Sequence, residues 1–345
     1  MLRLDNISKT YGDFKLRDID LEISRGEYFV LLGRSGAGKS QLLELIAGLR
    51  RPDSGSIFLN GQNITSEKIQ HRKTGIVFQD FAIFPHLDVY NNIAYSLKIR
   101  KLPKVETDRK VREMAASVNI THLLSRKPGS LSGGERQRLA VARTLVTSPD
   151  IILLDEPMAS IDTTLRDDVR RLLRKINDSG MTILHVTHDY QEAVRLAHRV
   201  GVIHNGKILQ TGEPDEVFSK PVNKFVARFA GIRNFYRVKV SRDKDKCYAR
   251  SAHHTYNVAS NGYGDEGLMM IRSDALELST EEFREHNCIR ARITEMNRAE
   301  TGYEIYLESG DKYHVLLKTK DVKKYDLRTG QFVFLLLPPG EIRII

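Results

Sequence analysis

Residues 33–41 have the types and spacing that suit phosphate chemistry. Three glycines, a lysine and a serine follow an apolar run at 28–32. Glycines let backbone N–H groups turn towards a phosphate, and the start of a following helix adds positive potential there. Lys39 is expected to reach the β- and γ-phosphates of a nucleotide, and Ser40 to ligate Mg²⁺. The predicted nucleotide-binding residues of this loop are Gly33, Arg34, Ser35, Gly36, Ala37, Gly38, Lys39, Ser40 and Gln41.

A second apolar run, 151–154, ends in two acids that could hold a metal ion and activate water. A strand that delivers a carboxylate beside a phosphate-binding loop anchors Mg²⁺, so Asp155 is assigned that role. Glu156, one residue further on, is placed to polarise the attacking water. Acids often follow strands, and a glycine turn can simply end one. The two segments are therefore informative because they occur together.

Residues 131–135 supply a second candidate anion site, because a serine and two glycines open a helix there. The alternative is a plain helix cap with a flexible approach. Two phosphate sites but one phosphate-binding loop make sense if the second site completes the nucleotide pocket of another copy of the chain. The predicted residues of this site are Ser132, Gly133, Gly134 and Glu135.

Alternating strand and helix patterns must position these residues. The runs 28–32 and 151–154 are apolar throughout, and 183–186 is apolar except for His185, a pattern typical of strands buried on both faces. Helices are predicted over 40–49 and 168–177, where apolar residues recur on one side. Parallel strands joined by crossover helices follow, so the fold class is α/β.

Two further regions differ from this core. Residues 69–126 look helical and predict a helical subdomain (about 80–145) inserted between the first and second core strands. From about Asn234, short alternating runs and turns such as Asn261-Gly262 and 309–311 predict a β-rich barrel-like domain.

These boundaries give a nucleotide-binding domain at 1–232 and a C-terminal domain at 233–345. The C-terminal domain could contain two related halves, 235–278 and 288–345.

Composition excludes several classes. The 345 residues are 41% hydrophobic and 28% charged, as in ordinary globular proteins, and no apolar run approaches the roughly 20 residues of a membrane span. The net charge of +10 comes from scattered residues, so no nucleic-acid partner is expected. Cys247 and Cys288 lack zinc-ligand spacing and are interpreted as reduced thiols with no redox role. Adjacent His253 and His254 on a strand would face opposite ways, which argues against a metal site.

The order and spacing of these motifs resemble the ATPases of the ABC transporter family over residues 1 to about 230. The resemblance implies an α/β P-loop ATPase with an antiparallel β subdomain and a helical subdomain. It also implies further roles. Tyr11 resembles the aromatic residue that stacks on adenine, and Gln79 the glutamine that contacts Mg²⁺ and the attacking water. Asp162 resembles the acid of the dimer loop, and His188 the histidine that contacts the γ-phosphate.

Each of these roles has a structural alternative: Tyr11 as a packed loop residue, Gln79 as a solvated turn residue and His188 as a satisfied buried histidine. The sequence also departs from the family pattern. Arg34 stands where proline is usual, which the backbone cradle does not require. Residues 158–161 replace the commoner Leu-Ser-Ala-Leu before Asp162, which leaves the details of the dimer loop open.

The region 233–345 is similar to the oligonucleotide-binding-like (TOBE) tails of importer ATPases, and residues 26–32 and 43–48 look most like molybdate/tungstate importers. The resemblance implies an ATP- and Mg²⁺-dependent homodimer bound through a membrane permease, itself linked to a substrate-binding protein, at the cytoplasmic face of the membrane. An oxyanion bound to the tail is a further possibility; a purely dimerising tail is the alternative.

Other readings remain open. The cargo could be sulfate, iron, polyamine or sugar. A soluble ABC ATPase acting on ribosomes or DNA usually has a second cassette or a long coiled coil, which are not visible here. An unrelated P-loop kinase or GTPase would leave residues 131–135 without a purpose.

Overall fold

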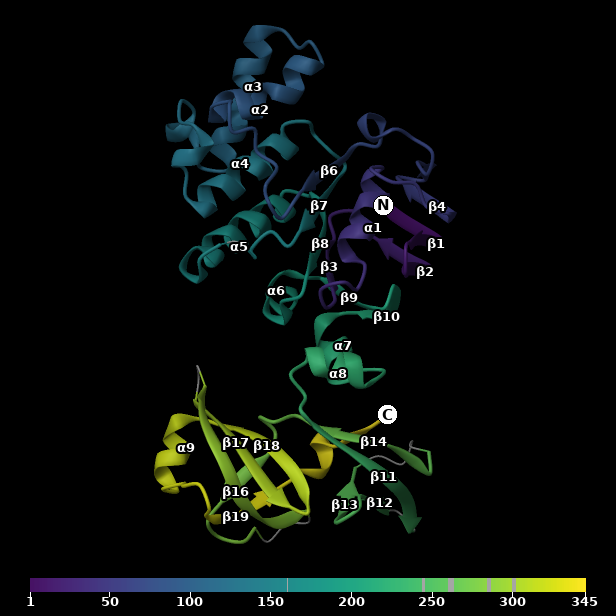
Figure 1. Ribbon diagram of the computed structural model, residues 1–345, viewed down its shortest axis with the longest axis vertical. Coiled ribbons are helices and arrows are strands. Elements are labelled where there is room, and N and C mark those ends of the chain that lie inside the picture. Colours follow the sequence, from purple (N-terminus) through teal and green to yellow (C-terminus); the bar gives the residue numbers. More distant parts are fainter. Residues whose placement is uncertain (160, 244–245, 260–263, 284–286, 300–301) are drawn as a thin grey trace. The chain divides into compact units, whose positions relative to one another are not determined.

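The computed structural model describes residues 1–159, 161–243, 246–259, 264–283, 287–299 and 302–345. It separates into two units, Met1–Val217 and Phe218–Ile345, each described by itself (Figure 1). The division falls inside α7 (Pro214–Ser219). The boundary predicted at 232–233 lies further on, between α8 (Lys224–Phe229) and β11 (Asn234–Asp243).

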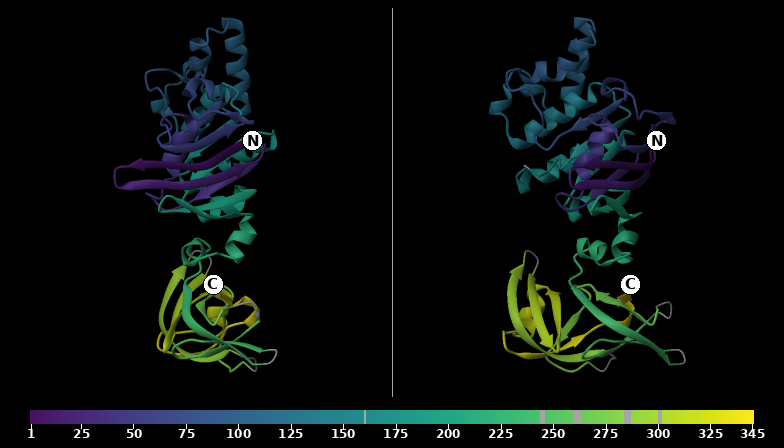
Figure 2. Two further views of the ribbon diagram at one scale, coloured as in Figure 1. Left: turned by 90° about the vertical axis from the view of Figure 1, so that its right-hand side faces the viewer. Right: turned by 45° about the vertical axis from the view of Figure 1, so that its right-hand side comes forward.

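The first unit contains two sheets, which Figure 2 shows from two sides. The smaller, antiparallel sheet has the order β2-β1-β4-β5, formed by β1 (Leu2–Tyr11), β2 (Phe14–Ile23), β4 (Ser54–Leu59) and β5 (Gln62–Asn63). The larger sheet has the order β10-β9-β3-β8-β7-β6 and is parallel except for the β9–β10 pair. Its strands are β3 (Tyr28–Leu32), β6 (Thr74–Val77), β7 (Ile151–Asp155), β8 (Thr182–Thr187), β9 (Arg199–His204) and β10 (Lys207–Gly212).

The predicted buried strands form the centre of the larger sheet. Every residue of β3, β7 and β8 is buried. The connections run through α1 (Lys39–Ala47), α5 (Thr163–Asp178) and α6 (Tyr190–Leu196). The predicted α/β fold is confirmed. The first helix ends before residue 49, because Gly48 has a φ of 85° and closes it in the left-handed conformation.

The helical part consists of α2 (Val89–Ile99), α3 (Lys104–Ser117) and α4 (Gly133–Leu145), which contact one another. Short 3₁₀ turns stand at Ile69–His71, Thr121–Leu123 and Pro128–Ser130. The expectation that 69–126 is helical was wrong at β6, the edge strand that pairs with β7. Four residues are too few to show a strand period, and Gly75 weakens the strand signal further. A Cβ at Gly75 would lie 2.3 Å from Thr144 Cγ2 of α4, so the close packing requires glycine.

Arg72 is a buried cation whose hydrogen-bond acceptors are backbone carbonyls. Only 1% of it is exposed. Its guanidinium donates to four carbonyl oxygens, two of them in the last turn of α1, at distances of 2.8–3.1 Å. Helix C-termini leave carbonyls without intrahelical donors, and Arg72 satisfies these. The acceptors are the carbonyls of Leu45, Ile46, Thr65 and Glu67.

We therefore expect Arg72→Met to destabilise the fold. Methionine keeps an unbranched apolar stem but lacks the guanidinium and leaves the buried carbonyls unsatisfied, which costs about 3 kcal/mol or more of unfolding free energy. The measurement is urea unfolding of the full chain. Arg109→Met, at an exposed site paired with Glu113, is the matched control and should change stability by less than about 0.5 kcal/mol. Equal midpoints for the two variants would contradict this role.

The second unit contains two five-stranded antiparallel sheets. The first has the order β13-β12-β11-β14-β20, with β12 (Lys246–Arg250), β13 (Thr255–Val258), β14 (Glu266–Ile271) and β20 (Arg343–Ile344) beside β11. The second has the order β15-β19-β16-β17-β18, formed by β15 (Glu277–Ser279), β16 (Cys288–Ala299), β17 (Gly302–Ser309), β18 (Asp311–Leu317) and β19 (Phe332–Leu336). A short helix, α9 (Thr319–Lys324), and a 3₁₀ turn, Pro339–Glu341, complete the unit.

The predicted β-rich region is confirmed, and its two halves exchange strands. β15 comes from the first half of the sequence yet pairs with β19, whereas β20 comes from the last residues and pairs with β14. The predicted turn at 309–311 joins β17 to β18, and Gly310 there has a φ of 76°. The turn predicted at Asn261-Gly262 lies outside the described residues.

Among the described residues, no helix is both long enough and apolar enough to cross a bilayer. Cys247 and Cys288 are free thiols, the former buried.

Candidate functional site

The loop between β3 and α1 wraps around the side chain of its own lysine. Lys39 is only 6% exposed, and its Nζ donates to the carbonyl oxygens of Gly33 at 2.8 Å and Arg34 at 3.3 Å. A Cβ at Gly33 would lie 2.7 Å from Ile203 Cγ2, and Gly38 has a φ of 106°, so glycine is required at both positions. The ammonium is therefore fixed at the C-terminal edge of the sheet, where α1 begins.

Asp155 ends β7 and Glu156 follows it at the same edge. Ser40 Oγ donates to Asp155 Oδ1 at 3.0 Å, which joins the two predicted magnesium ligands. Burial raises the pKa of Asp155, and the hydrogen bond from Ser40 opposes this effect. A hydroxyl and a carboxylate are hard oxygen donors of the kind that Mg²⁺ prefers, so the residues fit this ion.

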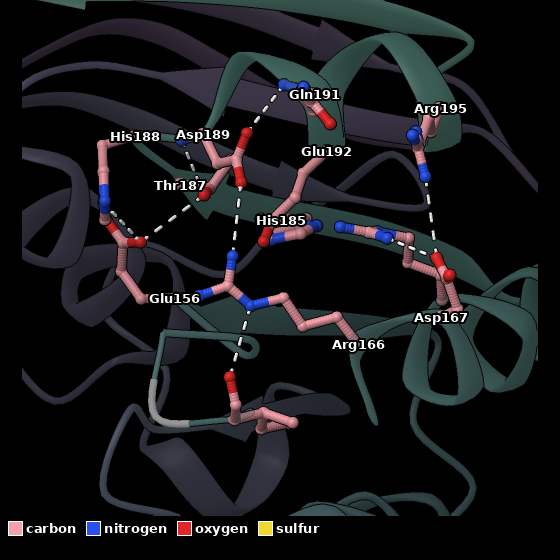
Figure 3. A network of polar contacts seen from close by, with 12 residues as sticks. Glu156, Arg166, Asp167, His185, Thr187, His188, Asp189, Gln191, Glu192 and Arg195 are labelled. Carbon is pink, nitrogen blue, oxygen red and sulfur yellow. Dashed lines mark hydrogen bonds and ion pairs between the residues drawn. The ribbon is translucent and has the colours of Figure 1, made fainter. Parts of the chain in front are cut away.

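Glu156 is the centre of a polar cluster (Figure 3). Its backbone has a φ of 47°, in the left-handed region, and its side chain is 12% exposed. Oε1 lies 3.3 Å from Lys39 Nζ, and Oε2 lies 2.9 Å from His188 Nδ1. Thr187 Oγ1, at the end of β8, donates to Oε2 at 3.4 Å. The side chain of His188 is 59% exposed and can turn towards a ligand.

Ser132–Glu135 form the N-terminus of α4 with a complete capping box. Ser132 Oγ accepts from the Glu135 N–H at 3.3 Å, and the Ser132 N–H donates to Glu135 Oε2 at 2.7 Å. That backbone hydrogen bond lowers the pKa of Glu135. In Figure 1, α4 and α1 lie on opposite sides of β6 and β7, so this helix start is separated from the phosphate-binding loop of the same chain.

Comparisons with known proteins can now be set beside this geometry. The family model described as ABC transporter matches residues 16–159. The molybdate/tungstate import ATP-binding protein WtpC of Thermococcus kodakarensis is 48% identical over 235 residues, which cover 68% of this chain and 71% of the relative. This chain belongs to the ABC transporter family. The predicted ABC ATPase resemblance is confirmed.

Two further relatives extend the comparison of this ABC ATPase. The spermidine/putrescine import ATP-binding protein PotA of Thermotoga maritima is 35% identical over 340 residues, covering 96% of this chain and 90% of the relative. A solved dimeric structure of the ATP-binding cassette MJ0796, in a post-hydrolysis state bound to ADP and Pi, superposes with a TM-score of 0.56. It is 29% identical and covers 62% of this chain and 99% of that one.

Gln79 of this ABC ATPase is exposed in the turn after β6. Because β6, β7 and β8 are parallel neighbours, the turn leaves the sheet at the same edge as Asp155 and Thr187. The loop that follows is held by α4. Arg143 donates to the Ala82 carbonyl, and its guanidinium lies 4.4 Å from the centre of the Phe84 ring. Arg143 thus connects α4, the helix capped by Ser132, to the loop that begins at Gln79.

Tyr11 is placed at the end of β1. Burial raises its pKa to about 12, and its hydroxyl has no hydrogen-bond partner among the described residues. The Arg50 guanidinium lies 5.9 Å from the centre of its ring. No contact with the phosphate-binding loop is recorded for Tyr11 in the described part of the chain, so its predicted stacking on adenine stays a prediction.

Asp162 is exposed in the loop between β7 and α5, and Ser160 of the same loop lies outside the described residues. Arg166 on α5 connects this loop to the end of β8. Its Nε donates to the Ile161 carbonyl at 3.3 Å, and its Nη1 lies 3.8 Å from Asp189 Oδ2.

Sequence reasoning missed several residues beside the site: Arg143, Arg166, His185, Thr187 and Glu192. A signal was present for two of them. His185 and Thr187 are polar residues two apart on a completely buried strand whose other residues after Thr182 are apolar. Such residues need polar partners, which indicates a polar cluster on one face of β8.

Proposed function

We propose that this chain is the ATP-hydrolysing subunit of an importer and that two copies bind two MgATP molecules between them. The observation that carries the proposal is the meeting of Lys39, Glu156 and His188, with contacts of 3.3 Å or less, at the C-terminal edge of a buried sheet. An ammonium that can hold phosphate, a carboxylate that can polarise water and a mobile imidazole are what phosphoryl transfer to water needs.

Residues 33–41 hold the phosphates through their backbone N–H groups and Lys39, and Tyr11 stacks on the adenine. Ser40, Asp155 and Gln79 are the residues assigned to Mg²⁺, whose chemistry is to neutralise charge on the phosphate oxygens. Glu156 accepts a hydrogen bond from the attacking water and so orients it, and Gln79 and His188 position the same water and the γ-phosphate.

The second half of each pocket comes from the other copy. Ser132–Glu135 of one protomer cap the γ-phosphate held by Lys39 of its partner, and Asp162 shapes the dimer loop. The hydrogen-bond donors at the start of α4 stabilise the γ-phosphate most strongly in an interface that excludes water. Loss of the γ-phosphate after hydrolysis removes the shared ligand, so the dimer opens. The dimeric, ADP- and Pi-bound cassette to which this chain is similar supports the pairing of two copies.

Movement is passed to a membrane permease through the loop after Gln79, at the cytoplasmic face of the membrane. A hollow of 160 Å³ opens beside this loop and is lined by residues of the loop, α2 and α4, among them Phe81, Tyr95 and Arg143. Its lining mixes aromatic side chains with polar ones and a single cation, Arg143, which suits an amphipathic segment of the permease.

The proposed cargo is an oxyanion, molybdate or tungstate, because relatives with that name are 47–48% identical over the nucleotide-binding region. The relative that matches along almost the whole chain is named for polyamines, and a sulfate/thiosulfate import relative is 40% identical over 280 residues. Sulfate, polyamine, iron and sugar are therefore the alternative cargoes.

The test is reconstitution of this chain in lipid vesicles with its permease and substrate-binding protein. Molybdate or tungstate should stimulate ATP hydrolysis several-fold, whereas sulfate, spermidine, iron and maltose should not. Stimulation by one of the latter would replace the oxyanion as cargo. Basal hydrolysis without stimulation by any of them, together with co-purification of ribosomes or DNA, would favour the soluble class.

The second unit is proposed to bind the same oxyanion as a regulator. A hollow of 440 Å³ there is lined by Arg237, Lys239 and Arg250 and by one carboxylate, Glu266, which lies 3.8 Å from Lys239 Nζ. The excess of cations suits an anion. Calorimetric titration of the full chain with molybdate should show heat that Arg250→Gln diminishes and that Arg109→Gln, an exposed change on α3, does not. No heat from the parent chain would leave dimerisation as the role of this unit.

A further inference from the structure

A buried polar cluster lies directly behind Glu156 and has no role in the hydrolysis scheme above. We call it the β8 cluster: Tyr28 on β3, His185 and Thr187 on β8, and Glu192 on α6. Each of these residues is 3% exposed or less. His185 and Thr187 are two positions apart on the strand, so they share a face, and α6 places Glu192 against that face. Figure 3 shows Glu192 beside His185, with Thr187 between this pair and Glu156.

The cluster surrounds a buried carboxylate with polar partners. His185 Nδ1 lies 3.0 Å from the Tyr28 hydroxyl, and His185 Nε2 lies 3.2 Å from Glu192 Oε2. The latter contact is close but poorly directed as a hydrogen bond. Burial alone would raise the pKa of Glu192, but His185, the Thr187 hydroxyl and the charge of Arg170 outweigh burial and lower it. Glu192 is therefore an anion at neutral pH.

Thr187 stands between two carboxylates. Its hydroxyl accepts from the Asp189 N–H at 3.1 Å and donates to Glu156 Oε2 at 3.4 Å. A hydroxyl has one hydrogen, which it can donate to one carboxylate at a time. The distance to Glu156 exceeds the usual O–H···O separation of about 2.8 Å, so Glu156 alone does not fix the hydroxyl. The Asp189 N–H, at the start of α6, also fixes its place.

We propose that Thr187 and Glu192 are positioning residues for ATP hydrolysis. Glu192, fixed by His185, anchors the start of α6, where the Asp189 N–H donates to the Thr187 hydroxyl oxygen and leaves the single hydroxyl hydrogen for Glu156. Thr187 in turn fixes the direction in which the Glu156 carboxylate meets the attacking water. This inference rests on the catalytic role proposed for Glu156. It extends that role to two residues that contact neither nucleotide nor water themselves.

The alternative is that the cluster only fastens α6 to β8. The two roles differ in what they predict for kinetics. Nucleotide binding depends on Lys39, Ser40 and the loop N–H groups. The loop meets the β8 cluster through the backbone, where the Gly33 N–H donates to the Thr187 carbonyl oxygen at 3.2 Å, and a change of a side chain in the cluster keeps this bond. A misdirected carboxylate therefore lowers kcat without changing KM for ATP, whereas a loosened α6 lowers stability and disturbs both.

The experiment is steady-state ATP hydrolysis by the full chain carrying Thr187→Val, Thr187→Ser, Glu192→Gln or both Thr187→Val and Glu192→Gln. Valine fills the same space without the hydroxyl, so kcat should fall about tenfold or more with KM for ATP unchanged. Serine restores the hydroxyl and should return kcat to within about threefold of the parent. The double variant should be no slower than Thr187→Val, since both changes act along one path.

Arg195→Gln is the matched control, because this exposed α6 residue pairs with Asp167 outside the cluster and should leave kcat unchanged. A Thr187→Val variant with parental kcat overturns the proposal. Parental kcat in Glu192→Gln alone removes Glu192 from it. If the losses of kcat in the two single variants add up in the double variant, while Tm falls and KM for ATP rises, the cluster has a structural role only.

Glu156→Gln is measured in parallel to separate two kinds of failure. If Glu156→Gln keeps its turnover, the catalytic role of Glu156 has failed and this inference fails with it. If Glu156→Gln is inactive while Thr187→Val is not, the proposed function stands and only the positioning role is lost.

Discussion

Glu156→Gln should lower the turnover of ATP by roughly 10²-fold or more while ATP binding is retained. The amide keeps the size of the side chain but is a poor acceptor for the proton of the attacking water. It also removes the negative charge that lies 3.3 Å from Lys39 Nζ, so the ammonium meets the phosphates without a competitor. Phosphate release measures the first effect. Light scattering during size-exclusion chromatography with ATP should show that the closed dimer accumulates.

Glu113→Gln is the control for this substitution, since Glu113 is an exposed residue of α3 paired with Arg109. It should match the parent in both measurements. Turnover near the parental rate in Glu156→Gln would remove Glu156 from the reaction, and loss of ATP binding would show that its main task is to organise the loop.

Ser132→Arg is expected to abolish turnover while each protomer still binds ATP. In the proposed dimer, Ser132 faces the γ-phosphate held by the partner, and an arginine there occupies the space that the γ-phosphate of that pocket needs. The change also removes a helix cap worth about 1 kcal/mol, so stability must be measured as well. Ser132→Ala loses the same cap without the bulk and should retain far more activity.

A mixing experiment makes the second prediction sharper. Ser132→Arg and Lys39→Ala are each inactive alone if the pocket is shared. Their heterodimer places both defects in one pocket and leaves the other pocket intact, so mixing the two inactive proteins should restore hydrolysis. A pocket contained within one protomer gives no recovery, and that result would refute the shared site.

Local motifs made much of the fold and site accessible from sequence. The phosphate-binding loop and the acids after 151–154 are short segments whose roles follow from their neighbours in the chain. The structure brings Lys39 and Ser40 against Glu156 and Asp155, as their placement after parallel strands implies. Continuous apolar runs identified β3 and β7, because strands buried on both faces need no polar residues, and the largely apolar run 183–186 identified β8.

Features that depend on distant segments could not be predicted in the same way. β6 is four residues long and is a strand only because β7 lies beside it. Arg72 looks like any surface arginine in the sequence, and its role appears only when the end of α1 meets it. The link from Glu192 through Thr187 to Glu156 joins α6, β8 and β7, and no spacing in the chain records it.

The exchange of β15 and β20 between the sheets of the second unit has a consequence for how that unit assembles. Ile344 pairs with Met269, and Leu278 pairs with Leu335, so each half donates its final strand to the sheet begun by the other. Neither sheet is complete until residues some 60 to 75 positions apart in the sequence have paired. Because each sheet contains strands from both halves, the two halves should unfold together in one cooperative transition.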